Sequence, residues 1–165
     1  MTAPDFADIA RVHGPLIGRI ARSYEANAAR AEELVQDVYL SVWQALPRFR
    51  GEASMRTFVA RFAHNRAISH VAREARAPRH VVLDDEMPAA APSPEDAAAH
   101  ADLRAKLEAA VQRLPLGQKL VITLALEGFS PEETGEVLGV SASAASVRLY
   151  RAKAALQAML KGGSR

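Results

Sequence analysis

The sequence contains no cysteine and few aromatic residues, and each shortage excludes a class of protein. Without cysteine there can be no disulfide and no thiolate metal site, which fits a reducing compartment. Aromatic residues make up only 5% of the 165 residues, and no series of short alternating strands stands out, so we expect an all-α fold. No apolar run approaches the ~20 residues of a membrane span, and the amino-terminal residues do not resemble a secretory signal. We therefore expect a cytoplasmic protein that does not insert into membranes.

Catalytic and metal-binding patterns are missing as well. The five histidines are dispersed along the chain and have no metal-ligand spacing with acidic residues. There is no Gly-rich phosphate loop, and no nucleophilic side chain lies next to a base in the sequence. We therefore predict that the protein is not an enzyme and that it uses neither a metal nor another cofactor.

A helix-turn-helix signature lies near the carboxyl end of the chain. Ser130 and Glu133 can form a capping box, with a proline at the first helical position between them. Gly139 follows the last apolar residue of this helix, where the chain needs a left-handed conformation that suits glycine. Ser141 can then cap the second helix, while Gly135 lets the two helices approach closely. This layout is typical of DNA-binding proteins.

The second helix of this motif is basic. From residue 139 onward the chain carries Arg148, Arg151, Lys153, Lys161 and Arg165 and no acidic residue. Such a helix can lie against phosphates while its first two turns reach base edges. The same residues also suit an ordinary helical hairpin with a solvated basic face, and this pattern alone does not decide between the two.

Composition divides the chain into three parts. Residues 1–76 and 95–165 carry apolar stripes at helical spacing, whereas residues 77–94 hold four prolines, three consecutive acidic residues and many alanines. We therefore expect two small helical domains joined by a flexible linker. The net charge is only +2, but acidic residues gather between residues 25 and 37 and arginines between residues 48 and 76. This separation of charge suggests separate partners.

The first domain is expected to contain three helices, over about residues 5–24, 28–46 and 54–76. Gly14 and Pro15 predict a bend or a restart in the first helix. The apolar stripe of the second helix favours a core position for Trp43. Acidic residues near the start of this helix also suit the helix dipole, so a merely solvated first turn is an open alternative.

The third helix interleaves arginines with Phe58, Phe62 and Asn65. Charge for the phosphate backbone and flat rings for the bases are what a single-stranded nucleic-acid surface needs. A core helix with solubilising arginines would have the same composition, so these residues alone leave both interpretations open.

Together, the two halves resemble the extracytoplasmic-function group of bacterial RNA polymerase sigma factors. In the first half the resemblance rests on AEELVQDVYL (31–40), VWQAL (42–46), FRGEASMRTF (49–58) and RFAHNRA (61–67). In the second half it rests on LP (114–115), GFSPEE (128–133), LGVS (138–141) and VRLYRAK (147–153). The resemblance implies a sigma region 2-like domain at residues 1–76, a linker at 77–94 and a sigma region 4-like helix-turn-helix domain at 95–165.

The resemblance also implies partners and contact residues. RNA polymerase core would bind the acidic second helix through Glu33, Gln36 and Asp37. The melted strand of the minus-ten element would bind eight residues of the loop and third helix: Phe49, Arg50, Gly51, Ser54, Phe58, Arg61, Asn65 and Arg66. The duplex minus-thirty-five element would be read by six residues of the last helix: Ser143, Ser146, Val147, Arg148, Tyr150 and Arg151. An anti-sigma factor is a further expected partner.

Two stretches depart from the family pattern. Phe58 and Ala60 stand where the family commonly has Trp and Tyr, so the stacking surface is reduced. Ser146 lies where a long basic side chain is frequent, and it cannot make a bidentate base contact, so we expect Arg148 and Arg151 to carry more of the binding.

The alternative functions are a helix-turn-helix transcriptional regulator with an N-terminal dimerisation or effector bundle, and a helical adaptor that binds no DNA.

Overall fold

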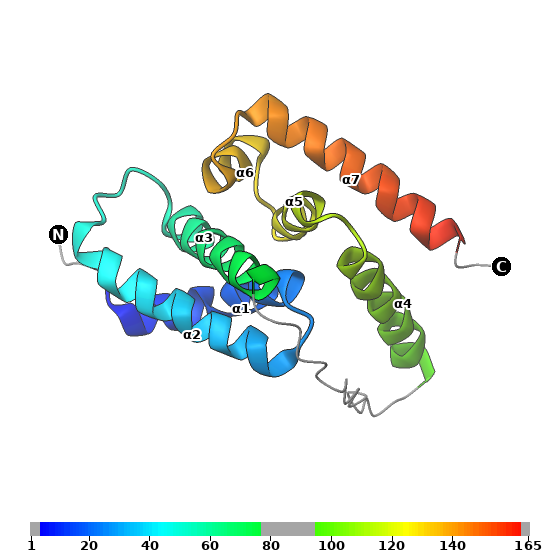
Figure 1. Ribbon diagram of the computed structural model, residues 1–165, viewed down its shortest axis with the longest axis horizontal. Helices are drawn as coiled ribbons and strands as arrows, with labels where there is room; N and C mark the ends of the chain where they lie inside the picture. The colour runs from blue at the N-terminus through cyan, green and yellow to red at the C-terminus, as the bar shows by residue number, and fades with distance from the viewer. Residues whose placement is uncertain (1–3, 77–94, 163–165) are drawn as a thin grey trace.

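The computed structural model describes residues 4–76 and 95–162, and every regular element in these ranges is a helix (Figure 1). The first half contains α1 (Phe6–Tyr24), α2 (Ala28–Ala45), a short 3-10 helix η1 (Leu46–Arg48) and α3 (Met55–Arg76). The second half contains α4 (Glu95–Gln112), α5 (Leu116–Leu126), α6 (Pro131–Leu138) and α7 (Ala142–Gly162). The predicted all-α class with two helical domains is confirmed. The predicted linker, residues 77–94, lies outside the described residues.

The first half is a bundle of α1, α2 and α3 held together by aliphatic side chains at helical spacing. Its most deeply buried members come from all three helices: Ile17, Ile20, Leu34, Val38, Val42 and Val59. Asp5 caps α1 by accepting a hydrogen bond from the Ala7 amide at 3.2 Å. Asn27 caps α2 by accepting from the Arg30 amide at 3.1 Å. Both caps satisfy amide donors that the first turn of a helix leaves unpaired.

Helix α1 runs through Gly14 and Pro15 without interruption, so the predicted restart there is wrong. Leu16 and Ile17 follow immediately and are buried, and their packing holds the chain helical despite the missing proline donor. Gly14 instead makes room for a neighbour. A Cβ at this position would lie 2.5 Å from the Tyr39 hydroxyl oxygen of α2.

The apolar stripes are narrower than the sequence pattern suggests. Trp43 was expected in the core, but it is 58% exposed because α1 and α3 cover only the side of α2 that carries Val38 and Val42. Val12 and Ile68, which share the apolar sides of α1 and α3 by spacing, are also exposed. These residues border the bundle without entering it.

The second half has a buried cluster of its own. Val111 near the end of α4 and Leu114 just after it meet Ile122 of α5 and Ala152 of α7. Helix α7 packs along both α5 and α6, while α4 lies against its carboxyl-terminal part (Figure 1). The helix-turn-helix is therefore supported by two further helices.

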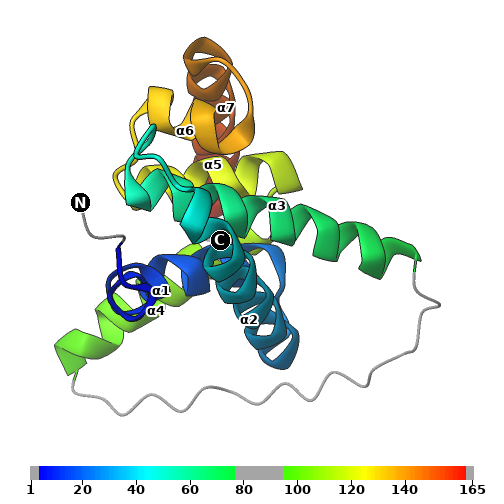
Figure 2. The same cartoon turned by 90° about the vertical axis from the view of Figure 1, so that its left-hand side faces the viewer.

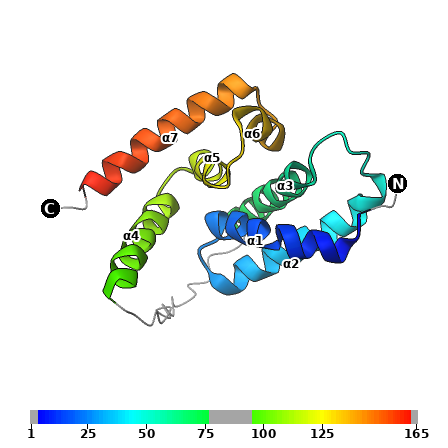
Figure 3. The same ribbon diagram turned by 180° about the vertical axis from the view of Figure 1, so that it is seen from behind.

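The two halves also pack directly against each other. In Figure 2, α6 and α7 lie above α3 and α5, with α1 and α2 below, and in Figure 3 α5 is seen next to α1. Four buried residues of the second half belong to the same apolar cluster as the first bundle: Leu120, Leu124, Phe129 and Val137. Helix α3 contributes mainly small side chains to this cluster, including Ala60, Ala63 and Ala67, so its neighbours can approach it closely.

A pair of glycine substitutions tests the packing of the helix-turn-helix. A Cβ at Gly135 would lie 2.6 Å from the backbone oxygen of Val140, whereas one at Gly117 would meet nothing within 4 Å. We expect Gly135→Ala to lower the free energy of unfolding by about 1–3 kcal/mol through overpacking. Gly117→Ala should leave it unchanged or raise it by up to ~1 kcal/mol. Equal effects of both substitutions in urea denaturation would contradict the close approach of α6 and α7.

Candidate nucleic-acid interface and partner surfaces

The turn between α6 and α7 is fixed by the residues that the sequence singles out. The Ser130 side chain accepts from the Glu133 amide at 3.1 Å, and the Glu133 carboxylate accepts from the Ser130 amide at 2.8 Å. Gly139 ends α6 in the left-handed conformation, with a φ of 70°. Ser141 caps α7 by accepting from the Ala144 amide at 3.1 Å. The predicted capping box, turn glycine and second cap are all confirmed.

Helix α7 presents one side to the protein and the other to solvent. Ala145 and Ala152 are buried, and Leu149 and Leu156 pack partly against α4 and α5. The predicted duplex contacts all lie on exposed positions: Ser143, Ser146, Val147, Arg148, Tyr150 and Arg151. Among the described residues, none of these six side chains enters a hydrogen bond or an ion pair. Tyr150 is 77% exposed, so an aromatic ring and two arginines are accessible along this helix.

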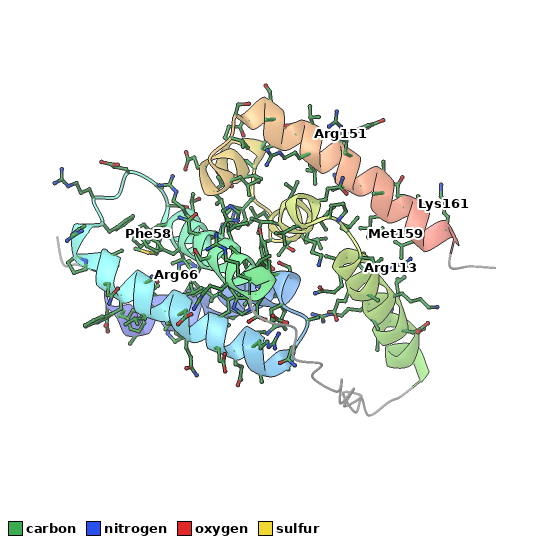
Figure 4. The ribbon with its side chains drawn as sticks, viewed as in Figure 1. Phe58, Arg66, Arg113, Arg151, Met159 and Lys161 are labelled. Carbon is green, nitrogen blue, oxygen red and sulfur yellow. The ribbon has the colours of Figure 1, made fainter. Side chains whose placement is uncertain are left out.

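The loop before α3 brings two of the predicted strand contacts together. Gly51 takes a φ of 74°, and Ser54 caps α3 by accepting from the Thr57 amide at 3.1 Å. Phe49 then lies against Phe58, with ring centroids 4.8 Å apart. Figure 4 shows Phe58 where the loop meets α3. Because the Ser54 hydroxyl serves as the helix cap, its first role is to position this loop.

A third ring extends this group, one that the resemblance does not place among the strand contacts. Phe62 packs on Phe58 at 4.9 Å between centroids, so Phe49, Phe58 and Phe62 form a continuous row. All three rings are partly exposed. The spacing of four residues between Phe58 and Phe62 was the available signal, since it puts both rings on one face of a helix. This row supplies a part-exposed, flat apolar surface, whereas Ala60 is buried on the other side of α3.

The remaining predicted strand contacts of α3 differ in their surroundings: one is free of hydrogen bonds to its side chain within the described part of the chain, and two are bonded to other helices. Asn65 is exposed at its side chain, whereas the Arg66 Nε donates to the Ser41 hydroxyl of α2. The Arg61 Nε donates to the backbone oxygen of Glu136 in α6, at 3.3 Å. Figure 4 shows Arg66 in the first bundle and Arg151 with Lys161 along α7. The two expected DNA surfaces thus lie on different helices of different halves.

The acidic side of α2 forms a separate surface. Glu33 and Gln36 are exposed, and Asp37 is half-exposed beside Arg73, with 3.7 Å between the nearest nitrogen and oxygen. The same face continues one and two turns later with Leu40 and Trp43, which are 53% and 58% exposed. The structure therefore adds apolar residues to the three predicted core-polymerase contacts. Next to them, Phe6, Trp43, Gln44, Leu46 and Pro47 line a shallow apolar hollow.

Several titratable side chains lie between α1 and α3. The Tyr24 hydroxyl is 3.1 Å from the His64 Nδ1, and burial lowers the pKa of His64 while raising that of Tyr24. His70 lies 2.9 Å from the Glu25 carboxylate. Burial, followed by the positive charge of Arg56, lowers the pKa of His13. These groups join α1 to α3, and residues 4–76 and 95–162 contain no group of His, Asp and Glu side chains arranged to hold a metal.

No helix in the described part of the chain is both long enough and apolar enough to cross a membrane.

Two family models cover most of the chain. The model described as sigma-70 region 2 matches residues 9–77, and the model described as sigma-70, region 4 matches residues 104–156. The RNA polymerase sigma factor NccH of Alcaligenes xylosoxydans is 30% identical over 164 residues, which cover 94% of this chain and 87% of that protein.

Two solved structures are similar to this chain in fold. The structure of CnrH in complex with the cytosolic domain of CnrY matches with a TM-score of 0.70 and 27% identity, over 96% of this chain and 89% of that one. The sigma factor RpoE from Bartonella quintana, solved with the anti-sigma factor NepR, matches with a TM-score of 0.73 over 95% of this chain and 97% of that one. At 21% identity, this second match shows the fold alone.

Two partly buried histidines predict how stability depends on pH. Because the folded protein keeps the pKa of His64 and His13 below the ordinary value, the unfolded chain binds more protons once the pH falls below about 6.5. The free energy of unfolding should therefore decrease from about pH 7 to pH 5, and His64 should contribute more of this decrease than the more solvent-screened His13.

The substitution His64→Gln should remove part of this slope, which denaturation at several pH values measures. His100→Gln, at an exposed position of α4, is the matched control and should leave the slope unchanged. The account of the α1–α3 contact is wrong if His64→Gln keeps the full slope of the natural protein.

Proposed function

This chain belongs to the extracytoplasmic-function group of RNA polymerase sigma factors, which direct the core enzyme to specific promoters. We propose that promoter recognition is divided between its halves. Residues 1–76 bind core polymerase and the melted minus-ten strand, and residues 95–165 read the minus-thirty-five element as duplex. The observation that carries this proposal is the placement of the expected contacts on three separate surfaces, on α2, on α3 with its loop, and on α7.

Duplex reading by α7 is supported by its geometry and charge. The capped turn holds α7 at a fixed angle to α6, and the residues at 143, 146, 147 and 150 share one face at helical spacing. Arg148 and Arg151 lie to one side of this face, are exposed, and carry no partner among the described residues. A major groove admits such a helix, and arginine binds both phosphates and guanine.

Capture of the opened strand by the first half is supported by the row of Phe49, Phe58 and Phe62. Stacking of a base on an aromatic side chain contributes about 1–3 kcal/mol and does not depend strongly on which base it is. Asn65 and the exposed arginines nearby supply hydrogen-bond donors for the strand. A base that leaves the duplex costs a few kcal/mol, which these contacts offset.

The third proposed surface binds core polymerase through Glu33, Gln36 and Asp37, with Leu40 and Trp43 beside them. Charge at the rim and an exposed apolar centre are common features of protein interfaces. We further propose that the chain acts by binding alone, without catalysis, in the cytoplasm where polymerase and promoter DNA are found. An anti-sigma factor is a proposed partner, since RpoE of Bartonella quintana is solved with one.

A regulator that uses only the helix-turn-helix is not favoured. Its first half would be a dimerisation or effector bundle, whereas residues 9–77 match the region 2 model of sigma factors. The two classes differ in a simple assay. A regulator binds its duplex operator alone, while a sigma factor gives transcripts only with core enzyme.

Run-off transcription with core polymerase and a genomic promoter library tests the proposed function. We expect new transcripts that require both this protein and the core enzyme. Absence of such transcripts, together with failure to co-purify with core polymerase, would contradict the proposal.

Loss of Arg148 should weaken duplex reading. If Arg148 contacts a phosphate, Arg148→Ala should reduce the slope of log affinity against log salt concentration by ~0.9. If Arg148 contacts a base through two hydrogen bonds, the same substitution should cost about 1–3 kcal/mol of binding free energy. Fluorescence anisotropy measures both the affinity and its salt slope, with a duplex of a promoter found in the run-off assay and at several salt concentrations. Arg104→Ala is the control, because Arg104 is an exposed α4 residue whose partner is Glu108. Unchanged affinity and slope for Arg148→Ala would remove this residue from the interface.

Reversing a charge on α2 should disturb docking on the polymerase. We expect Glu33→Lys to weaken association with core by about tenfold or more, because like charges at an interface cost several kcal/mol. Glu108→Lys makes the same change at an exposed position of α4 and should leave association unchanged. The affinity of each variant for core polymerase is measured by its competition with the natural protein. Equal affinities of the Glu33→Lys and Glu108→Lys variants would show that the acidic face of α2 is only solvated.

A further inference from the structure

The outer face of α7 carries two large apolar side chains that the fold does not bury. Val147 is 50% exposed and Tyr150 is 77% exposed. Neither belongs to an apolar cluster of the described residues, in which α7 takes part through residues of its inner side such as Leu149 and Ala152. An exposed valine is also a poorer helix former than alanine. Packing and helix stability therefore do not account for this pair.

Helical geometry places the pair at the middle of the exposed face. An α-helix turns by about 100° per residue, so Val147 and Tyr150 lie roughly 60° apart around the axis of α7. Arg151 and then Arg148 follow on one side of the pair, and Lys153 follows on the other. All five side chains are exposed. The face therefore has an uncharged centre between two basic edges.

The basic edges indicate which partner fits this face. No acidic residue follows Gly139 in the sequence, and the basic side chains at 148, 151 and 153 are exposed and unpaired among the described residues. Cations on both edges of a helix suit the two phosphate backbones that border a major groove. An apolar protein partner would leave these cations without counter-charges. In a duplex, the uncharged centre faces the edges of the base pairs.

The residue types on α7 limit which bases it can select. In the major groove, arginine and lysine bind guanine, asparagine and glutamine bind adenine, and aspartate and glutamate bind cytosine. Residues 142–153 include none of the last four types. The hydroxyls of Ser143 and Ser146 can bond to more than one base and so discriminate little. Thymine carries a C5 methyl group that an apolar side chain recognises, so it is the base that matches the centre of the face.

Small side chains around Val147 let it approach the bases. Ser143, Ala144 and Ser146 precede it, and none of them is longer than a serine. A helix with short side chains in its first turns can lie deep in a major groove, which is about 12 Å wide and 8.5 Å deep. The left-handed turn at Gly139 fixes where this end of α7 begins. Val147 is thus the first large apolar group that the groove meets.

We propose that Val147 determines base specificity in α7 by packing on the C5 methyl group of a thymine in the minus-thirty-five element. Tyr150, three residues later on the same face, extends this apolar surface. The arginines and Lys153 at the edges supply affinity for the backbone. This inference rests on the proposed function for duplex reading by α7, and it adds the base that is selected and the side chain that selects it.

Uracil provides a direct test, because it lacks only the methyl group of thymine and keeps the same pairing edge. The protein is bound to core polymerase, and the probe is a fluorescent promoter duplex from the run-off assay. Each thymine of the minus-thirty-five element, on either strand, is replaced singly by deoxyuridine. Burial of one methyl-sized group corresponds to about fourfold in affinity, so we expect at least one replacement to weaken binding by about that factor. Equal binding of all these duplexes would overturn the proposal.

Two substitutions test whether Val147 makes the methyl contact. Val147→Ala removes both γ-methyl groups at an exposed helical position that suits alanine, so the variant should fold. We expect it to bind the sensitive thymine and uracil duplexes within about twofold of each other. Leu160→Ala is the matched control, because it shortens another exposed aliphatic side chain farther along α7 and should keep the fourfold preference. A full preference for thymine in Val147→Ala, or its equal loss in both variants, would overturn the role of Val147.

Failure of this inference and failure of the proposed function give different results. A complex that makes core-dependent transcripts but binds thymine and uracil duplexes equally would overturn the methyl contact and leave the proposed function intact. Absence of core-dependent transcripts would contradict the proposed function, and the base contact with it.

Discussion

Helix α3 packs against both the first bundle and the α5–α6 region, and this packing organises the molecule. Small buried residues such as Ala60 and Ala63 let neighbouring helices approach α3 closely, and Arg56 and Arg61 extend from it to the α5–α6 region. The Phe58–Phe62 pair, which suits unpaired bases, lies on the other side of the same helix. One helix therefore joins the halves with one side and presents aromatic rings with another.

Two further surfaces lie away from this packing. The acidic and apolar face of α2 is exposed, and so is the outer face of α7. The proposed docking on core polymerase and the proposed reading of duplex therefore use faces that the contact between the halves leaves uncovered.

Local structure could be predicted from the sequence where a residue type has one physical use. Ser130, Glu133 and Gly139 gave the caps and the turn of the helix-turn-helix, and the six expected residues of α7 are all exposed. Trp43 lies outside the core and Pro15 does not restart α1, because tertiary packing decides which side of a helix is covered and whether a proline interrupts it. The docking of the halves had no local signal. Arg56 looked like any other arginine of a basic helix, and only the fold shows that its partners lie more than 70 residues away.

The central claim is that one protein grips a promoter at two separated places, on unpaired bases with α3 and on intact duplex with α7. Photo-crosslinking in the complete initiation complex tests it most directly, with a photoreactive residue at Phe58 in one preparation and at Tyr150 in another. The account predicts that the first crosslinks to one strand at the minus-ten element only when core polymerase is present, and that the second crosslinks to duplex at the minus-thirty-five element. Crosslinks from both positions to the same element, or none from Phe58 in a complex that is actively transcribing, would contradict it.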